Sequence, residues 1–238
     1  MGMRGPAGAQ EPPGGQVWYV AYGSNMAAGR LACYLAGGRP PGAARSYPGA
    51  RDRRMPVRSA TVELPGVMYF ATRSPVWKGG RAFYDPDAEG TVRARAHLVS
   101  VGQFSDIAAQ EMYRPPGHDL DLGPVLAEGR ARLGPGRYET LVSPGDLDGV
   151  PLLTFTAPWR AADVPWTKPS AAYVRLLAVG LLEAGAWDAD GIARYLASRP
   201  GAAGQWTAEE IMLLLADPAD PADPPGSTGS PGPAGFTG

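Results

Sequence analysis

The run Tyr22-Gly23-Ser24-Asn25 follows directly after a short apolar segment, residues 17–21, and precedes a helical pattern. A strand that ends in a glycine-containing turn and then opens a helix leaves several backbone N–H groups unpaired and pointing the same way. Such groups suit a carboxylate or an oxyanion. Asn25 is a favoured N-cap residue, so a helix is predicted over residues 26–35. The turn therefore predicts an anion-binding site.

Glu111 is the carboxylate that could move protons beside such a turn. It lies late in a predicted helix over about residues 101–113. It follows Ile107 by four residues and Ala108 by three, which places it at the edge of an apolar stripe. One positioned carboxylate can take a proton and return it during a reaction. The competing interpretation is a solvent-facing helix glutamate.

Two other candidate sites are weaker. Ser24 lacks a partner base, because the only histidines are His97 within a strand and His118 in a Pro-Gly-rich loop. A serine nucleophile is therefore not favoured. His118 with Asp119 and Asp121 could ligate a divalent ion, but no partner motif occurs elsewhere in the chain. A polar loop is the preferred interpretation, and no metal site is predicted.

The composition limits the classes of function. The chain has 238 residues and a net charge of −1, and its basic residues are scattered, which argues against nucleic-acid and membrane partners. The single cysteine, Cys33, precludes an internal disulfide and indicates a reducing compartment. The most apolar stretch, residues 176–182, is too short to span a bilayer. We therefore expect a cytoplasmic protein, and its oligomeric state stays open.

The apolar periodicity predicts mainly strands in the first two thirds and helices in the last third. Strands are predicted over residues 17–22, 57–63, 66–72, 81–85, 91–99, 137–143 and 150–157. Helix signals are the capping boxes Ser100/Gln103 and Thr207/Glu210, the N-caps Ser170 and Asp188, and the stop Gly185. Without regular β-α-β alternation, these elements indicate an α+β fold: a small mixed curled sheet or barrel with outer helices.

Four segments stand in the order and approximate spacing of one family. They are Tyr22-Gly23-Ser24-Asn25, the turn Trp77-Lys78-Gly79-Gly80-Arg81-Ala82, Ala109-Gln110-Glu111, and Pro169-Ser170-Ala171-Ala172-Tyr173. Across about residues 17–185 the chain resembles the γ-glutamylcyclotransferase superfamily, a compact mixed barrel whose first loop carries YGSN and whose catalytic acid/base is a single Glu.

The resemblance implies a cofactor-free enzyme that cyclises a γ-glutamyl group to 5-oxoproline and releases an amine or amino acid. Glu111 would be the catalytic acid/base. Substrate contacts would come from Tyr22, Gly23, Ser24, Asn25, Met26, Gly79, Gly80, Tyr138 and Tyr173. The three tyrosines could equally be core residues whose hydroxyls are satisfied within the protein. The turn could hold either the substrate carboxylate or the reaction oxyanion.

We expect a disordered tail over 1–15, a catalytic domain over 16–185, a packed helical extension over 186–216 and a second disordered tail over 217–238. An insertion over residues 112–137 can reshape the pocket on the side of the released amine. The alternatives are the same fold acting on another amide, such as a γ-glutamyl-capped biosynthetic intermediate, by hydrolysis or acyl transfer, and a non-catalytic binding module.

Overall fold

The structure is a computed structural model that describes residues 12–40 and 46–216. The expected tail over 217–238 lies outside the described residues, as does most of the tail expected over 1–15. Residues 13–15 form a short 3-10 turn that leads into the first strand. No helix within the described ranges is both long and apolar enough to cross a membrane.

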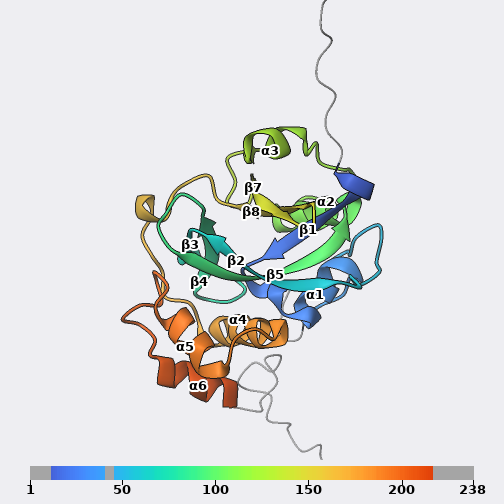
Figure 1. Ribbon diagram of the computed structural model, residues 1–238. Coiled ribbons are helices and arrows are strands. Elements are labelled where there is room, and N and C mark those ends of the chain that lie inside the picture. Colours follow the sequence, from blue (N-terminus) through green and yellow to red (C-terminus); the bar gives the residue numbers. More distant parts are fainter. Residues whose placement is uncertain (1–11, 41–45, 217–238) are drawn as a thin grey trace, which may run out of the picture.

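A mixed six-stranded sheet forms the centre of the molecule (Figure 1). Its order is β2 (Ser59–Pro65), β5 (Thr91–Ser100), β1 (Gln16–Ala21), β8 (Val150–Thr156), β7 (Thr140–Leu147) and β6 (Arg130–Arg132). Strand β1 pairs antiparallel with β5 and parallel with β8. All residues of β1 after Gln16 are buried, which explains its nearly continuous apolar run. The predicted α+β class with a curled mixed sheet is confirmed.

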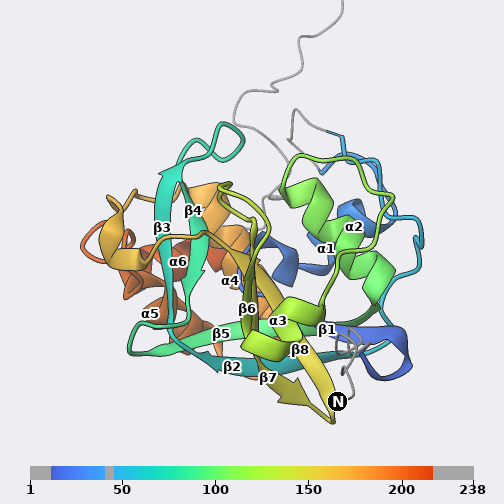
Figure 2. The ribbon, with the colours of Figure 1, turned by 90° about the horizontal axis from the view of Figure 1, so that it is seen from above.

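A second sheet consists of the hairpin β3 (Val67–Arg73) and β4 (Gly80–Asp85). The Thr156 hydroxyl at the end of β8 joins it to the main sheet, because it donates to the Tyr84 carbonyl (2.6 Å) and accepts from the Tyr84 N–H (3.0 Å). A side chain thus replaces continuous strand pairing at this junction. The hairpin lies at one end of the molecule, away from helices α1 and α2 (Figure 2).

In the part of the chain that the structure describes, six α-helices surround these sheets: α1 (Ala28–Leu35), α2 (Val101–Glu111), α3 (Gly123–Glu128), α4 (Ala171–Ala184), α5 (Ala189–Ala197) and α6 (Ala208–Ala216). The predicted capping boxes at Ser100 and Thr207 are confirmed, as are the caps at Ser170, Asp188 and Gly185. Helix α3 and strand β6 were not predicted. Both lie in the insertion, where their short length leaves no readable periodicity.

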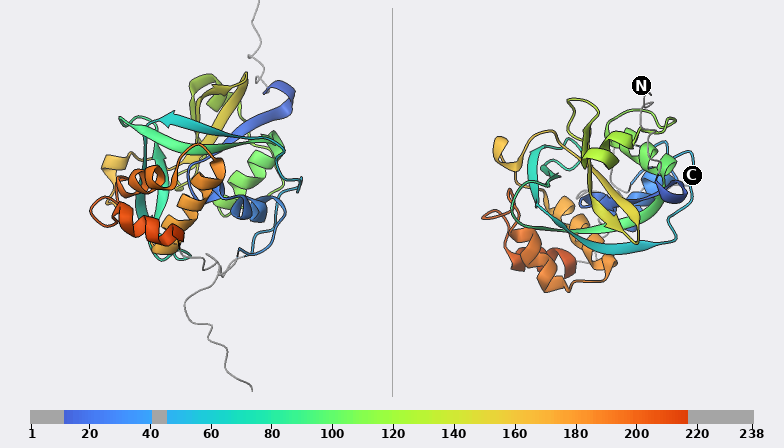
Figure 3. Two further views of the ribbon diagram at one scale, coloured as in Figure 1. Left: turned by 60° about the horizontal axis from the view of Figure 1, so that its bottom comes forward. Right: turned by 45° about the horizontal axis from the view of Figure 1, so that its top comes forward.

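The C-terminal helices α5 and α6 pack against α4 (Figure 3). Ile192 of α5 and Ile211 of α6 are fully buried. The Trp206 indole N–H donates to the Pro169 carbonyl (3.0 Å), and the Arg175 Nε–H donates to the Leu214 carbonyl (2.8 Å). Residues 186–216 therefore share the core with the preceding part of the chain.

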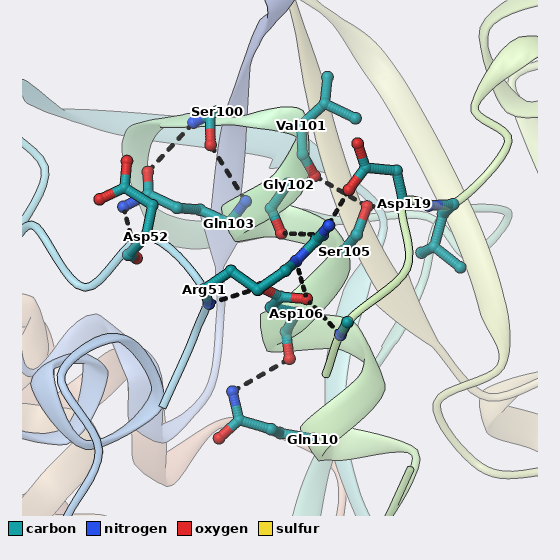
Figure 4. A network of polar contacts seen from close by, with 12 residues as sticks. Arg51, Asp52, Ser100, Val101, Gly102, Gln103, Ser105, Asp106, Gln110 and Asp119 are labelled. Atoms are coloured by element: carbon teal, nitrogen blue, oxygen red, sulfur yellow. Dashed lines mark hydrogen bonds and ion pairs between the residues drawn. The ribbon is translucent and has the colours of Figure 1, made fainter. Parts of the chain in front are cut away.

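Helix α2 is fixed in place by a buried carboxylate (Figure 4). Asp106 is fully buried and accepts hydrogen bonds from the Arg51 backbone N–H (2.8 Å), the Arg51 Nε–H and the Gly117 N–H (3.0 Å). Arg51 also pairs with Asp119, a residue of the considered metal cluster. Within the described ranges, no group of three His, Cys, Asp or Glu is placed to hold a metal ion. The network joins two loops to the helix that ends at Glu111.

Asp106→Ala is expected to destabilise the fold by about 2–3 kcal/mol, because it removes several charge-assisted hydrogen bonds and leaves backbone donors unpaired. Urea unfolding followed by circular dichroism measures this loss. Asp119→Ala is the matched control, because it removes the half-exposed partner of the same arginine, whose contribution is at most about 1 kcal/mol. Equal losses in the two variants would contradict the anchoring role of Asp106.

Candidate active site

A pocket lies where β1 ends, between the turn after β1, the ends of α1 and α2, and the start of α4. It brings together predicted site residues that are far apart in the sequence: Tyr22, Gly23, Ser24, Asn25, Glu111, Tyr138 and Tyr173. The expected proximity of Glu111 to the turn is therefore found. The pocket also includes residues that the sequence did not indicate, above all Tyr19, Arg30, Tyr34 and Tyr47.

Met26, Gly79 and Gly80, which we expected to contact substrate, are not among the residues that line the pocket. The Met26 side chain is buried against α4, whose Gly180 leaves room for it. A Cβ on Gly80 would lie 2.1 Å from the Thr167 carbonyl oxygen. The two glycines therefore allow the segment before α4 to approach β4 closely. The described contacts of these three residues are packing contacts, and their contact with substrate stays a prediction.

Asn25 does not cap a helix, contrary to the prediction. Residues 24–26 form a 3-10 turn, and α1 begins only at Ala28, without a side-chain cap. The Asn25 amide is therefore free to turn into the pocket, where its Nδ2 donates to the Tyr19 hydroxyl (3.0 Å) and to Glu111 Oε1 (3.2 Å). The side chain that looked like a cap joins the turn to the end of α2.

The orientation of the Asn25 amide follows from its partner. A carboxylate accepts hydrogen bonds only, so the amide must present its NH₂ group to Glu111. The Asn25 Oδ1 is then buried and receives no hydrogen bond from the described residues. A buried acceptor without a donor is costly, which favours a ligand N–H at this position. Glu111 and Asn25 Oδ1 together suit an amine.

The backbone of the turn keeps free donors. The Met26 N–H donates to the Gly23 carbonyl (3.1 Å) and the Ala27 N–H to the Ser24 carbonyl (3.2 Å). The N–H groups of Gly23, Ser24 and Asn25 donate to no atom of the described residues. Because all three residues line the pocket, these donors are available to an anion there. The anion itself stays a prediction.

Arg30 places a buried positive charge in the pocket wall. Arg30 is only 7% exposed, and its Nη2 donates to the hydroxyls of Tyr34 (3.2 Å) and Tyr47 (2.6 Å). The guanidinium carbon lies 4.6 Å from the centroid of the Tyr47 ring and 5.9 Å from that of Trp77. The Arg30–Tyr34 spacing of four residues was the one signal in the sequence that could have indicated this cluster.

The three predicted tyrosines differ in what their hydroxyls can do. Tyr22 donates to the Phe155 carbonyl (2.8 Å) and Tyr138 to the Ala82 carbonyl (3.1 Å), so both are committed to the backbone. Tyr173 accepts from the Ala82 N–H (3.2 Å), and its own hydrogen has no acceptor among the described residues. Burial raises the pKa of Tyr173 to about 12, so it stays a neutral donor at neutral pH. Tyr173 is therefore best placed to bind a ligand oxygen.

Burial shapes the electrostatics around Glu111. The pKa values of Tyr19 and Tyr34 lie well above the usual tyrosine value, first because both are buried and then because the Glu111 charge opposes ionisation. Both hydroxyls therefore remain protonated. The carboxylate ends a helix in a site made mostly of aromatic rings and neutral donors, where a charge interacts more strongly than in water.

Comparisons with known proteins find matches of low sequence identity. No protein-family model matches the chain. The chain is similar to histone deacetylase 5 of Arabidopsis thaliana, with 28% identity over an alignment of 191 residues that covers 71% of this chain. It spans only 28% of that protein, so the activity in that name is not transferred to this chain.

Two solved structures are distantly similar to this chain. An uncharacterized human protein aligns with a TM-score of 0.48 and 15% identity, covering 85% of this chain and 99% of its own. A gamma-glutamyl cyclotransferase aligns with a TM-score of 0.46 and 14% identity, covering 84% and 98%. Scores and identities this low establish neither family nor function.

His97 gives a direct test of the packing beneath the turn. It lies on β5 opposite Tyr19 and is 3% exposed. Burial, with the nearby Arg95 charge, lowers its pKa from 6.5 to about 4. In an NMR titration, the His97 ring signals should therefore keep their neutral shifts down to about pH 5, and His97→Gln identifies them. Because the unfolded chain takes up this proton near pH 6.5, the contribution of His97 to stability falls from there towards pH 4. A midpoint near 6.5 in the folded protein would contradict the described burial.

Proposed function

We propose that this protein is a γ-glutamyl cyclotransferase that converts a γ-glutamyl amide to 5-oxoproline and a free amine. The observation that carries the proposal is the meeting of Glu111, the Asn25 amide and the unpaired N–H groups of residues 23–25 in one pocket. These groups match the three needs of the reaction: a proton acceptor, an amine contact and donors for an oxyanion.

The chemistry is intramolecular. The α-amine of the substrate attacks its own γ-carbonyl carbon, and the C–N bond to the departing amine then breaks. Holding the glutamyl chain folded supplies an effective molarity on the order of 10⁵ M or more. The protein therefore has to position the chain, move protons and stabilise the tetrahedral intermediate. None of these steps requires a metal or an organic cofactor.

Glu111 carries the proton transfers in this proposal. With Asn25 Oδ1 it holds the α-amine, takes a proton from the attacking nitrogen and delivers one to the departing nitrogen. The negative charge that develops on the γ-carbonyl oxygen is stabilised by backbone N–H groups of the turn. The neutral Tyr173 hydroxyl supports a further hydrogen bond to the substrate.

A second candidate keeps these residues and changes the substrate to a larger γ-glutamyl-capped amine. Tyr113, near the start of the 112–137 insertion, favours this second candidate. It lines the pocket, and 55% of its surface is exposed. An exposed aromatic ring beside the pocket offers more contact than a small amino acid uses. Comparing γ-glutamyl-alanine with γ-glutamyl conjugates of bulky apolar amines separates the two candidates, because the second requires higher kcat/KM for the bulky conjugates.

Glu111→Gln is expected to lower the rate of 5-oxoproline formation roughly 10²- to 10⁴-fold, because an amide cannot take up and return the proton. The fold should persist, since a glutamine oxygen can still accept from the Asn25 amide. The assay measures 5-oxoproline released from γ-glutamyl-alanine and γ-glutamyl amines.

Glu128→Gln is the matched control for this test. Glu128 also ends a helix, α3, but it is exposed and lies outside the pocket lining, so its loss should leave turnover unchanged. Near-wild-type activity in the Glu111 variant would contradict the assigned base. No 5-oxoproline from any γ-glutamyl compound would contradict the proposed function itself.

Ser24→Ala separates the proposal from serine nucleophile chemistry. The substitution keeps every backbone N–H of the turn, so turnover should stay within about tenfold of wild type. Loss of a true nucleophile would instead remove nearly all activity, roughly 10³-fold or more. Steady-state kinetics on the same substrate decide between the two outcomes.

A further inference from the structure

Arg30 is a buried cation that no carboxylate of the described residues neutralises at close range. Among the described residues, no carboxylate oxygen lies within 4.0 Å of its guanidinium. Its Nη2 is hydrogen-bonded to two tyrosine hydroxyls, whereas its Nε is buried and has no partner in the described structure. Aromatic rings stabilise a buried guanidinium but leave this donor unsatisfied. The arrangement favours an anionic ligand in the pocket.

Arg81 shows that this situation is particular to Arg30. Both arginines line the pocket and both are 7% exposed. The Arg81 Nη2 donates to the Arg73 carbonyl (2.8 Å) across the β3–β4 hairpin, so its side chain is tied to the fold. Arg30 instead bonds to the hydroxyls of Tyr34 and Tyr47, and both of these tyrosines line the pocket.

We propose that Arg30 binds the α-carboxylate of the γ-glutamyl substrate, which makes a free carboxylate on the glutamyl unit a requirement for turnover. The inference rests on the proposed function and deepens it. The α-carbon of that unit carries one amine and one carboxylate. Glu111 with Asn25 Oδ1 meets the amine, and Arg30 meets the carboxylate.

The charges of the two protein groups fit this pairing. Burial alone would lower the pKa of Arg30, but the neighbouring tyrosines and the Glu111 charge raise it above its ordinary value. The charges of Glu111 and Arg30 are therefore close enough to influence each other without forming an ion pair. A zwitterionic head group between them pairs with both. The turn could bind either the substrate carboxylate or the reaction oxyanion. With the carboxylate held by Arg30, the backbone N–H groups of the turn are left for the oxyanion.

The test compares two substrates that differ only at the proposed contact: γ-glutamyl-alanine and its analogue with an α-carboxamide on the glutamyl unit. Cyclised product is measured by liquid chromatography for both. We expect wild type to prefer the carboxylate by about 10- to 100-fold in kcat/KM, the range that charge-assisted hydrogen bonds support. Arg30→Met should reduce this preference to a few-fold, mainly by losing activity on the carboxylate, and Arg30→Lys should restore part of it.

Arg81→Met is the matched comparison, because any loss it causes should be equal for both substrates and leave the preference unchanged. Equal turnover of the two substrates by wild type would overturn the inference while leaving the proposed function intact, and it needs no variant. If Arg30→Met loses turnover of both substrates equally and its pH profile shifts, the substitution acts only through Glu111. This outcome would also overturn the inference. Absence of cyclised product from both substrates would instead contradict the proposed function.

Discussion

The hydrogen bond between Asn25 Nδ2 and Glu111 Oε1 joins two parts of the fold that are 86 residues apart in the sequence. One partner lies in the turn after the central strand β1, and the other is the last residue of α2. The bond fixes the orientation of the amide, leaves its oxygen unpaired and places the carboxylate against the turn. The chemical character of the pocket depends on this one contact.

The surrounding structure holds both partners in place. Strand β1 lies between β5 and β8, so the turn that follows it begins from a buried strand that has a neighbour on each side. On the other side, Asp106 anchors α2 to two loops, and the Gln110 amide donates to the Tyr34 carbonyl (2.9 Å). Rigid support of this kind keeps catalytic groups in position when substrate binds. The buried polar residues of α2 thus help to position the helix.

The sequence predicted most of the elements and the two segments that meet in the pocket, because strands with continuous apolar runs and helices with capping boxes carry local signals. It could not predict which tyrosine hydroxyls are used within the fold, since this depends on the carbonyls of Ala82 and Phe155. The N-cap prediction for Asn25 was wrong because a tertiary contact with Glu111 competes with capping. Arg30 was missed because an arginine in a short helix is usually exposed, and only the fold brings Tyr47 over it.

The central claim is that Asn25 and Glu111 act as one unit in proton transfer. A double-mutant cycle measures it most directly, with Asn25→Ala, Glu111→Gln and the combined variant assayed for 5-oxoproline formation from the same γ-glutamyl substrate. Residues that act as a unit are strongly non-additive, so the combined variant should be no slower than Glu111→Gln alone. Losses that multiply, so that the combined variant is slower by the full product of the single effects, would contradict the shared site.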